Sequence, residues 1–260
     1  SIIKNNIILG TNKGLFSKKD NRFLLSNNIL DLAVESSKEI WLATDKGLYR
    51  YFQNNNNKVI IDGLKSNSAV LSVQLDKMNR KWLGTLNGLV KLDTKKSKKD
   101  IYIYNEADGL ISNTIYSTCQ VPGGIVATGS GGISYIKNYN NVISYNISSD
   151  EFNSCVYDNN KESVWVSTDK SGIKLINLDD GEVVASYTMS NGLSNNEIYN
   201  LFIDNKSNLW VSTDGGGLSI YNGQGWRNIL EVKNIGTLSI EDSYDYNYFI
   251  GDTVPYDFGE

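Results

Sequence analysis

The chain has 260 residues, of which 29 are acidic and 25 are basic, and its net charge is −4. This charge provides no basic face to neutralise phosphates, which argues against a nucleic-acid partner. The sequence contains no histidine, which excludes Ser-His-Asp and Cys-His catalysis and histidine-ligated zinc. We expect no metal and no cofactor.

One phrase recurs along the chain: an apolar pair, a small residue, threonine, a short polar turn, glycine and an aliphatic residue. Its first copy is residues 8–15 (ILGTNKGL). A period of about 40 residues with only short β segments indicates a propeller or a solenoid. The repeated position is occupied by Thr11, Thr44, Thr85, Thr128, Thr168 and Thr213, with Asp252 in a degraded seventh copy.

Each copy predicts a β-hairpin whose turn glycine can adopt a positive φ. An apolar segment that ends in an acidic turn precedes the hairpin, as at residues 29–35 and 70–76, and a tyrosine-containing segment such as residues 101–104 follows it. A hairpin cannot bury both faces alone, so four strands per period predict a blade that packs on its neighbours. We therefore expect residues 1–260 to form one all-β domain, a β-propeller of four-stranded antiparallel blades.

The blade number follows from counting strands. The hairpin strand has seven copies, but the acidic-ended strand has six, near residues 29, 70, 115, 152, 198 and 235. The first copy has no such strand before it, so we expect the C-terminal segment to supply one and close the ring. Six blades with a spare hairpin, or seven with the last incomplete, both satisfy the count.

Other features appear within this pattern. The lysine-rich segment 95–99 is expected to be a solvated loop. Cys119 and Cys155 lie on successive acidic-ended strands, offset by one residue, so we expect free thiols that point to opposite faces. The repeated tryptophans are expected to pack between blades; they are Trp41, Trp82, Trp165 and Trp210.

No stretch has the apolar length needed to span a bilayer, and no signal peptide opens the chain, so we expect no membrane contact by this segment itself. The start at Ser1, without methionine, suggests a piece of a longer protein.

The acidic turn before the hairpin phrase, as in residues 76–82 (DKMNRKW) and 204–210 (DNKSNLW), resembles the two-component regulator propeller repeat. Residues 108–115 (DGLISNTI) and 191–198 (NGLSNNEI) resemble that family's link into the next blade. The likeness spans nearly the whole chain, although the fourth copy lacks its tryptophan and several copies have Ser or Ala for the small glycine. WD, kelch and Asp-box propellers fit less well. Streptogramin lyases are propellers with comparable repeats, but they depend on histidine, which this sequence lacks.

The resemblance implies a seven-bladed, non-catalytic input module of a membrane-anchored hybrid histidine kinase. It implies an extracytoplasmic location, periplasmic or at the cell surface, a glycan ligand and a homodimer formed through the parent kinase.

A polar ring is predicted where the links between blades meet the acidic-ended strands. Its members are Asn27, Asn67, Asn113, Asp150, Asn196 and Asn234. In a propeller these links surround the mouth of the central channel, where amides and a carboxylate suit sugar hydroxyls. The alternative is that each side chain caps its own turn. Trp226 lies outside the repeat and is predicted to stack on a sugar or to cover a sheet edge.

Three functions remain open. The first is a sensor that binds an oligosaccharide or another small polar ligand, and the second is a protein-binding scaffold. The third is a glycan-active enzyme that uses carboxylates alone, for which two acids across a cleft are needed.

Overall fold

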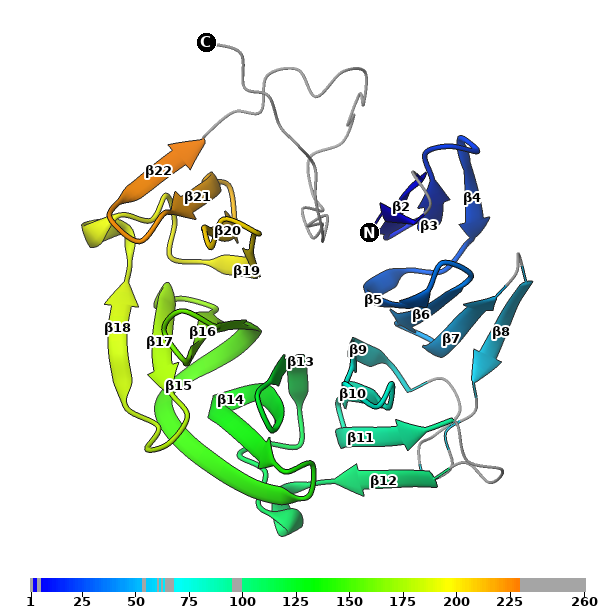
Figure 1. Cartoon of the computed structure of the whole chain (residues 1–260), viewed down its shortest axis with the longest axis horizontal. Coiled ribbons are helices and arrows are strands. Elements are labelled where there is room, and N and C mark those ends of the chain that lie inside the picture. Colours follow the sequence, from blue (N-terminus) through cyan, green and yellow to red (C-terminus); the bar gives the residue numbers. More distant parts are fainter. Residues whose placement is uncertain are drawn as a thin grey trace.

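The computed structural model describes residues 2–3, 6–52, 55–59, 61, 63, 68–94 and 100–229. These residues form short antiparallel strands arranged in an arc around a central axis, with the first strand of each repeat innermost (Figure 1). The expected all-β propeller of antiparallel sheets is confirmed. Within the described ranges, no helix has the length and apolar character needed to cross a membrane.

The strands group into five sheets. The first contains β1 (Ile2–Ile3), β2 (Asn6–Thr11), β3 (Gly14–Ser17) and β4 (Arg22–Leu25). The second contains β5 (Ile29–Ser36), β6 (Glu39–Thr44), β7 (Gly47–Phe52) and β8 (Asn55–Val59). The third contains β9 (Val70–Leu75), β10 (Lys81–Thr85), β11 (Gly88–Asp93) and β12 (Asp100–Tyr104).

The fourth sheet has six strands: β13 (Ile115–Val121), β14 (Gly124–Lys137), β15 (Asn141–Asp158), β16 (Ser163–Thr168), β17 (Ile173–Asn177) and β18 (Val183–Tyr187). The fifth contains β19 (Ile198–Ile203), β20 (Leu209–Thr213), β21 (Gly217–Tyr221) and β22 (Trp226–Ile229). Two short 3-10 helices, η1 (Glu106–Asp108) and η2 (Met189–Asn191), precede β13 and β19.

The six-stranded sheet consists of two blades. The first half of β14 pairs with β13 and its second half pairs with β15, so β14 holds both strands of a hairpin. Asn138 N donates to Gly123 O at 2.7 Å where these halves lie side by side. The first part of β15 pairs with β14, whereas residues 152–158 pair with β16. The described strands therefore form six blades in five sheets.

The first blade departs from expectation. β1 pairs with β2 through Ile2 and Ile3, so the first copy does have a strand before it, and the sequence-based statement to the contrary is wrong. The pairing takes the same side of β2 that the acidic-ended strands take in later blades. The predicted seventh copy and the closing strand fall in residues 230–260, and the lysine-rich segment is 95–99; both lie outside the described residues.

Hydrogen bonds explain the recurring phrase. The threonine hydroxyl donates across the turn to the carbonyl of the phrase's glycine, as Thr44 does to Gly47 and Thr85 does to Gly88, at 2.7 Å in both cases. Gly88 has the predicted positive φ, 111°. A β-carbon there would lie 2.1 Å from the carbonyl oxygen of Tyr104, so glycine is required by space as well as by conformation.

The acidic turn and the tryptophan act together. Each indole N–H donates to the carboxylate that ends the preceding strand; the pairs are Trp41–Glu35 at 2.7 Å, Trp82–Asp76 at 2.9 Å, Trp165–Asp158 at 3.0 Å and Trp210–Asp204 at 2.9 Å. Trp82 is fully buried in a cluster that includes Ile115 and Ile125 of the next blade. Trp165 packs in the same way on Ile198. The expected packing of tryptophan between blades is confirmed at these positions.

The two cysteines occupy equivalent positions, which corrects the expected opposite orientation. Cys119 pairs with Val126 and Cys155 pairs with Val166, each two residues before the repeat threonine. Ile115 pairs with Gly129, one residue beyond the repeat threonine, whereas Phe152 pairs with Thr168 itself, so β13 has one extra residue before its cysteine, which accounts for the apparent offset. Both thiols are buried and free, as expected, in one hydrophobic cluster.

Candidate functional site

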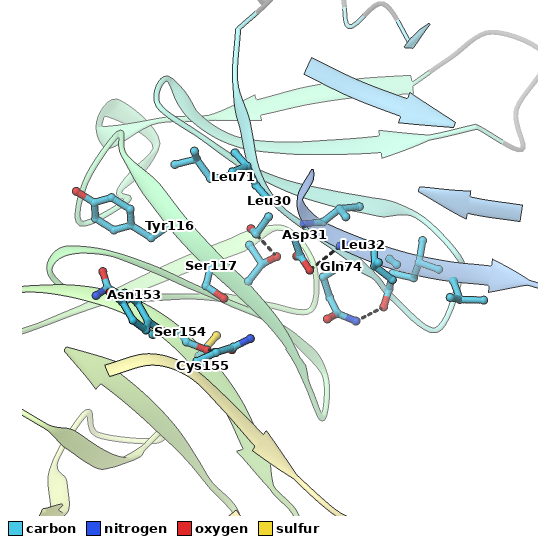
Figure 2. Close-up of a pocket in the computed structure, with 18 residues that line it drawn as sticks. Leu30, Asp31, Leu32, Leu71, Gln74, Tyr116, Ser117, Asn153, Ser154 and Cys155 are labelled. Carbon is cyan, nitrogen blue, oxygen red and sulfur yellow. Dashed lines mark hydrogen bonds between the residues drawn. The ribbon is translucent and has the colours of Figure 1, made fainter. Parts of the chain in front are cut away.

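A cavity of about 520 Å³ (Figure 2) is lined by strands that lie innermost in the arc (Figure 1). The acidic-ended strands β5, β9, β13 and β19 and residues 152–158 of β15 provide its wall. This volume lies within the range typical of ligand pockets, about 300–1,000 Å³.

A belt of short polar side chains runs around this wall at one repeated position. Each member pairs with the residue just before the repeat threonine. We call this set the polar belt; it consists of Asp31, Ser72, Thr118, Ser154 and Asn200. The belt therefore presents hydroxyl, amide and carboxylate groups from five blades to one space.

Hydrogen bonds along the polar belt connect neighbouring blades. Ser72 Oγ lies 3.3 Å from Thr118 Oγ1, and Ser154 Oγ donates to Asn200 Oδ1 at 2.7 Å. The main-chain N–H of Val73 donates to Asp31 Oδ2 at 2.8 Å. These contacts position the belt side chains and satisfy part of their hydrogen-bonding capacity.

Larger side chains adjoin the belt on the cavity wall. Tyr116 and Tyr199 contribute aromatic rings, whereas Leu30 and Leu71 contribute aliphatic surface. Leu30 and Tyr199 are each 38% exposed, so part of this surface is available for contact. Burial and then the nearby carboxylate of Glu151 raise the pKa of Tyr116, which keeps its hydroxyl protonated. The cavity thus combines aromatic and aliphatic surface with polar groups.

Asp31 is the one carboxylate among the described residues that line the cavity, and no Lys or Arg is among them. Burial raises its pKa from the usual 3.8 to about 6, against the opposing effect of the N–H groups of Val73 and Leu32. Leu32 N lies 2.7 Å from Asp31 Oδ1. The side chain is half-buried, so it remains in reach of the cavity.

The described members of the predicted polar ring lie outside this lining. Asn113 Oδ1 accepts from Glu106 N at 3.0 Å, and Asn196 Oδ1 accepts from Met189 N at 2.7 Å, so each amide holds the start of a 3-10 helix. Their main-chain carbonyls accept from Gly88 N and Gly172 N in the preceding turns. Both side chains thus serve the link between blades.

The remaining ring members have different surroundings. Asp150 accepts hydrogen bonds from Ser148 Oγ at 2.8 Å and Ser171 Oγ at 3.1 Å. Asn27 is half-buried in the link before β5. Asn67 and Asn234 lie outside the described residues. None of the described ring members lines the cavity, and ligand binding by the ring stays a prediction.

Trp226 lies in β22, the outermost strand of its blade, on the far side of the sheet from the cavity (Figure 1). Its ring centroid is 5.1 Å from that of Tyr221 and 5.3 Å from that of Tyr187. Gly192 lies against the indole so closely that a β-carbon would overlap it. The structure therefore places Trp226 in the packing between the last two described blades.

The polar belt was missed by the sequence reasoning, although a signal exists. In each described acidic-ended strand a short polar residue interrupts the apolar run two or three residues after its first buried side chain, and in β13 and β15 a second polar residue precedes it. Its identity varies between repeats, and the extra residue in β13 shifts its position. A search for a conserved residue type therefore does not find it, whereas a search for polarity at the repeat position would.

Comparison with known proteins gives one family match and several similar structures. Residues 192–215 match the family model described as two component regulator propeller. No curated protein matches the chain in sequence. The extracellular domain of the putative hybrid two component system BT4673 from B. thetaiotaomicron has a TM-score of 0.70 and 21% identity, covering 92% of this chain and 34% of that domain. The chain thus spans about a third of that domain.

Two other structures have similar folds. PorZ of the type-IX secretion system of Porphyromonas gingivalis has a TM-score of 0.70 and 15% identity, covering 85% of this chain and 37% of PorZ. Virginiamycin B lyase from Staphylococcus aureus has a TM-score of 0.65 and 12% identity, covering 87% of this chain and 84% of the lyase. At these identities the likeness concerns the fold.

Proposed function

We propose that this chain is the ligand-sensing input propeller of a membrane-anchored two-component regulator, because residues 192–215 match the model of the two component regulator propeller. The likeness to the extracellular domain of a putative hybrid two component system supports this proposal and an extracytoplasmic location. The chain spans 34% of that domain, and we propose that signal transmission and a homodimer are properties of the parent regulator as a whole.

The observation that favours a small polar ligand is the composition of the central cavity. Sugars present hydroxyls around their edge and apolar C–H groups on their faces. A cavity wall with the polar belt beside Tyr116 and Tyr199 complements both surfaces. We therefore propose an oligosaccharide as the ligand, bound without chemical change.

A thermal-shift screen with plant and host oligosaccharides tests this function. We expect at least one saccharide to raise the melting temperature of the chain, and we expect Tyr199→Ala to abolish the shift. Tyr102→Ala is the matched control, because Tyr102 is 46% exposed and lies on the outer strand β12. No shift with any saccharide would favour the alternative of a protein-binding scaffold.

The enzyme alternative is less well supported. A glycosidase needs two carboxyl groups, about 5–10 Å apart, whereas Asp31 is the one acid among the described lining residues. The S. aureus lyase has a catalytically inactive form in which a histidine is replaced by alanine, and this chain has no histidine. Turnover that disappears on changing one carboxylate to its amide would overturn the non-catalytic proposal.

A further inference from the structure

The cavity wall carries a negative charge that binding of a neutral sugar does not require. Among the described residues that line it, Asp31 is the one side chain with a formal charge at neutral pH. The equivalent belt positions in neighbouring blades hold Ser72, Thr118, Ser154 and Asn200. The fold therefore accepts a neutral residue at this position, and the carboxylate of Asp31 is not needed to build a blade.

The carboxylate of Asp31 is only partly satisfied by the protein. Its two oxygens each accept one main-chain hydrogen bond, from Leu32 N at 2.7 Å and from Val73 N at 2.8 Å. A carboxylate offers about four acceptor sites, so roughly two remain. In Figure 2 Asp31 projects from β5 on the opposite side of the cavity from Asn153 and Ser154.

Among the described residues that line the cavity, no side chain that faces Asp31 is positively charged. The strand packed against it from the next blade, β9, contributes the N–H of Val73. The other titratable side chains of the described lining are Tyr116, Tyr199 and Cys155, none of which can become cationic. Glu35, on the same strand, forms an ion pair with Lys81 at 2.8 Å. Burial without a counter-charge agrees with the raised pKa of Asp31.

We infer that the cavity selects a ligand with a positively charged amine, such as an amino sugar with a free amino group, and that Asp31 binds this amine. This inference rests on the proposed function and names the chemical class of its ligand. An ammonium group would use the free acceptor sites of Asp31 while ring hydroxyls contact the polar belt. Acidic saccharides are disfavoured, because a second carboxylate would meet Asp31 without a cation between them.

Binding of three tetrasaccharides to the whole 260-residue chain tests the inference by calorimetry at pH 7.0. The probes are the β-1,4-linked glucosamine tetramer, cellotetraose, which has the same linkage and no charge, and the galacturonic acid tetramer. We expect the glucosamine tetramer to bind about tenfold more tightly than cellotetraose, and the acidic tetramer to bind more weakly than both.

Variants separate this site from general attraction to an acidic protein. Asp31→Ser introduces the residue type that Ser72 and Ser154 provide at the equivalent positions of their blades. Both Asp31→Ser and Asp31→Asn should remove the amine preference and retain cellotetraose binding. Asp45→Asn changes the net charge equally at an exposed turn and should retain the preference. At pH 5.0, where Asp31 is largely protonated, the preference of the unmodified chain should fall toward that of Asp31→Ser.

Two results would overturn the inference. If the preference persists in Asp31→Ser and Asp31→Asn, the amine is attracted by the protein as a whole. If cellotetraose binds and the amine gives no advantage, the ligand is a neutral saccharide, and the proposed function stands without the inference. Absence of binding by all three tetramers also overturns the inference, and the wider saccharide screen then decides the proposed function separately.

Discussion

At the scale of single residues, Asp31 links the pH dependence of stability to the cavity. Its folded-state pKa of about 6 lies above the usual 3.8, so the native state binds more protons between these values. The contribution to stability is therefore fully present below pH 3.8 and is lost as the pH rises through 6. We expect the free energy of unfolding, relative to Asp31→Asn, to fall between pH 4 and pH 7.5 by at most about 3 kcal/mol.

Urea denaturation of both proteins across this pH range measures the difference. Asp45→Asn, at an exposed turn, should give a curve parallel to that of the unmodified chain. A difference between the unmodified chain and Asp31→Asn that stays constant from pH 4 to pH 7.5 would contradict the burial of this carboxylate.

Asp76 provides the second prediction at this scale. It is 3% exposed and accepts from Trp82 Nε1 at 2.9 Å and from Arg80 Nε at 2.6 Å. Asp76→Ala removes both acceptors and leaves the guanidinium of Arg80 without its carboxylate. We expect a loss of about 3–5 kcal/mol in the free energy of unfolding, measured by denaturation. Asp45→Ala, at its exposed turn, should cost less than about 0.5 kcal/mol; equal losses in both variants would refute the role of the acidic turn.

At the scale of the strand and its turn, the hairpin phrase was predictable because local chemistry determines it. The positive φ of Gly88 and the β character of the tryptophan strands follow from residue type alone. The small residue before each threonine has a longer-range cause. A β-carbon on Gly84 would lie 2.5 Å from Ser72 Oγ and 2.7 Å from the carbonyl oxygen of Ile115 in the next blade. The residues of the phrase are therefore determined by the spacing between blades as well as by the turn.

The turn glycine gives a prediction at this scale. Gly88→Ala forces a β-carbon to 2.1 Å from the carbonyl oxygen of Tyr104 in a backbone with φ of 111°. We expect a loss of about 3 kcal/mol, because strain and displacement of β12 add together. Gly225→Ala is the matched control, since no atom lies within 4 Å of its β-carbon position. Thermal denaturation of both variants measures the difference in stability. A Gly88→Ala protein as stable as Gly225→Ala would contradict the close approach of Gly88 to the carbonyl oxygen of Tyr104.

At the scale of the whole molecule, the arrangement of blades was predictable and the cavity wall was not. The repeat period implies a propeller, and the tryptophans correctly indicate where one blade packs on the next. The lining comes from strands about 40 residues apart in sequence, and these strands meet only where neighbouring blades pack together. The extra residue in β13 is a local event that altered the alignment of Cys119 with Cys155. One such shift is enough to hide a repeated position such as the polar belt.

An ion pair between two blades is expected to contribute to cooperative unfolding of the described array. Lys81 Nζ, with no exposed side-chain surface, lies 2.8 Å from Glu35 Oε2 of the preceding blade and 4.6 Å from the ring centroid of Trp41. Neighbour interfaces of this kind make a repeat array cooperative, because the energy of each blade depends on its neighbours. Replacing Glu35 leaves the ammonium of Lys81 buried without a carboxylate, with Asn79 O and Thr94 Oγ1 as its remaining hydrogen-bond acceptors.

A double-mutant cycle measures this coupling. Glu35→Gln alone leaves the ammonium of Lys81 buried without its carboxylate, and we expect a loss of about 3–5 kcal/mol. Lys81→Met in the same chain removes that penalty, so the double variant should be more stable than Glu35→Gln and the coupling energy should exceed about 1 kcal/mol. The more exposed pair of Arg50 with Glu39, within one sheet, should give a coupling of about 0.2–1 kcal/mol. A cycle at Glu35 and Lys81 no larger than that of the exposed pair would mean that packing alone holds these two blades together.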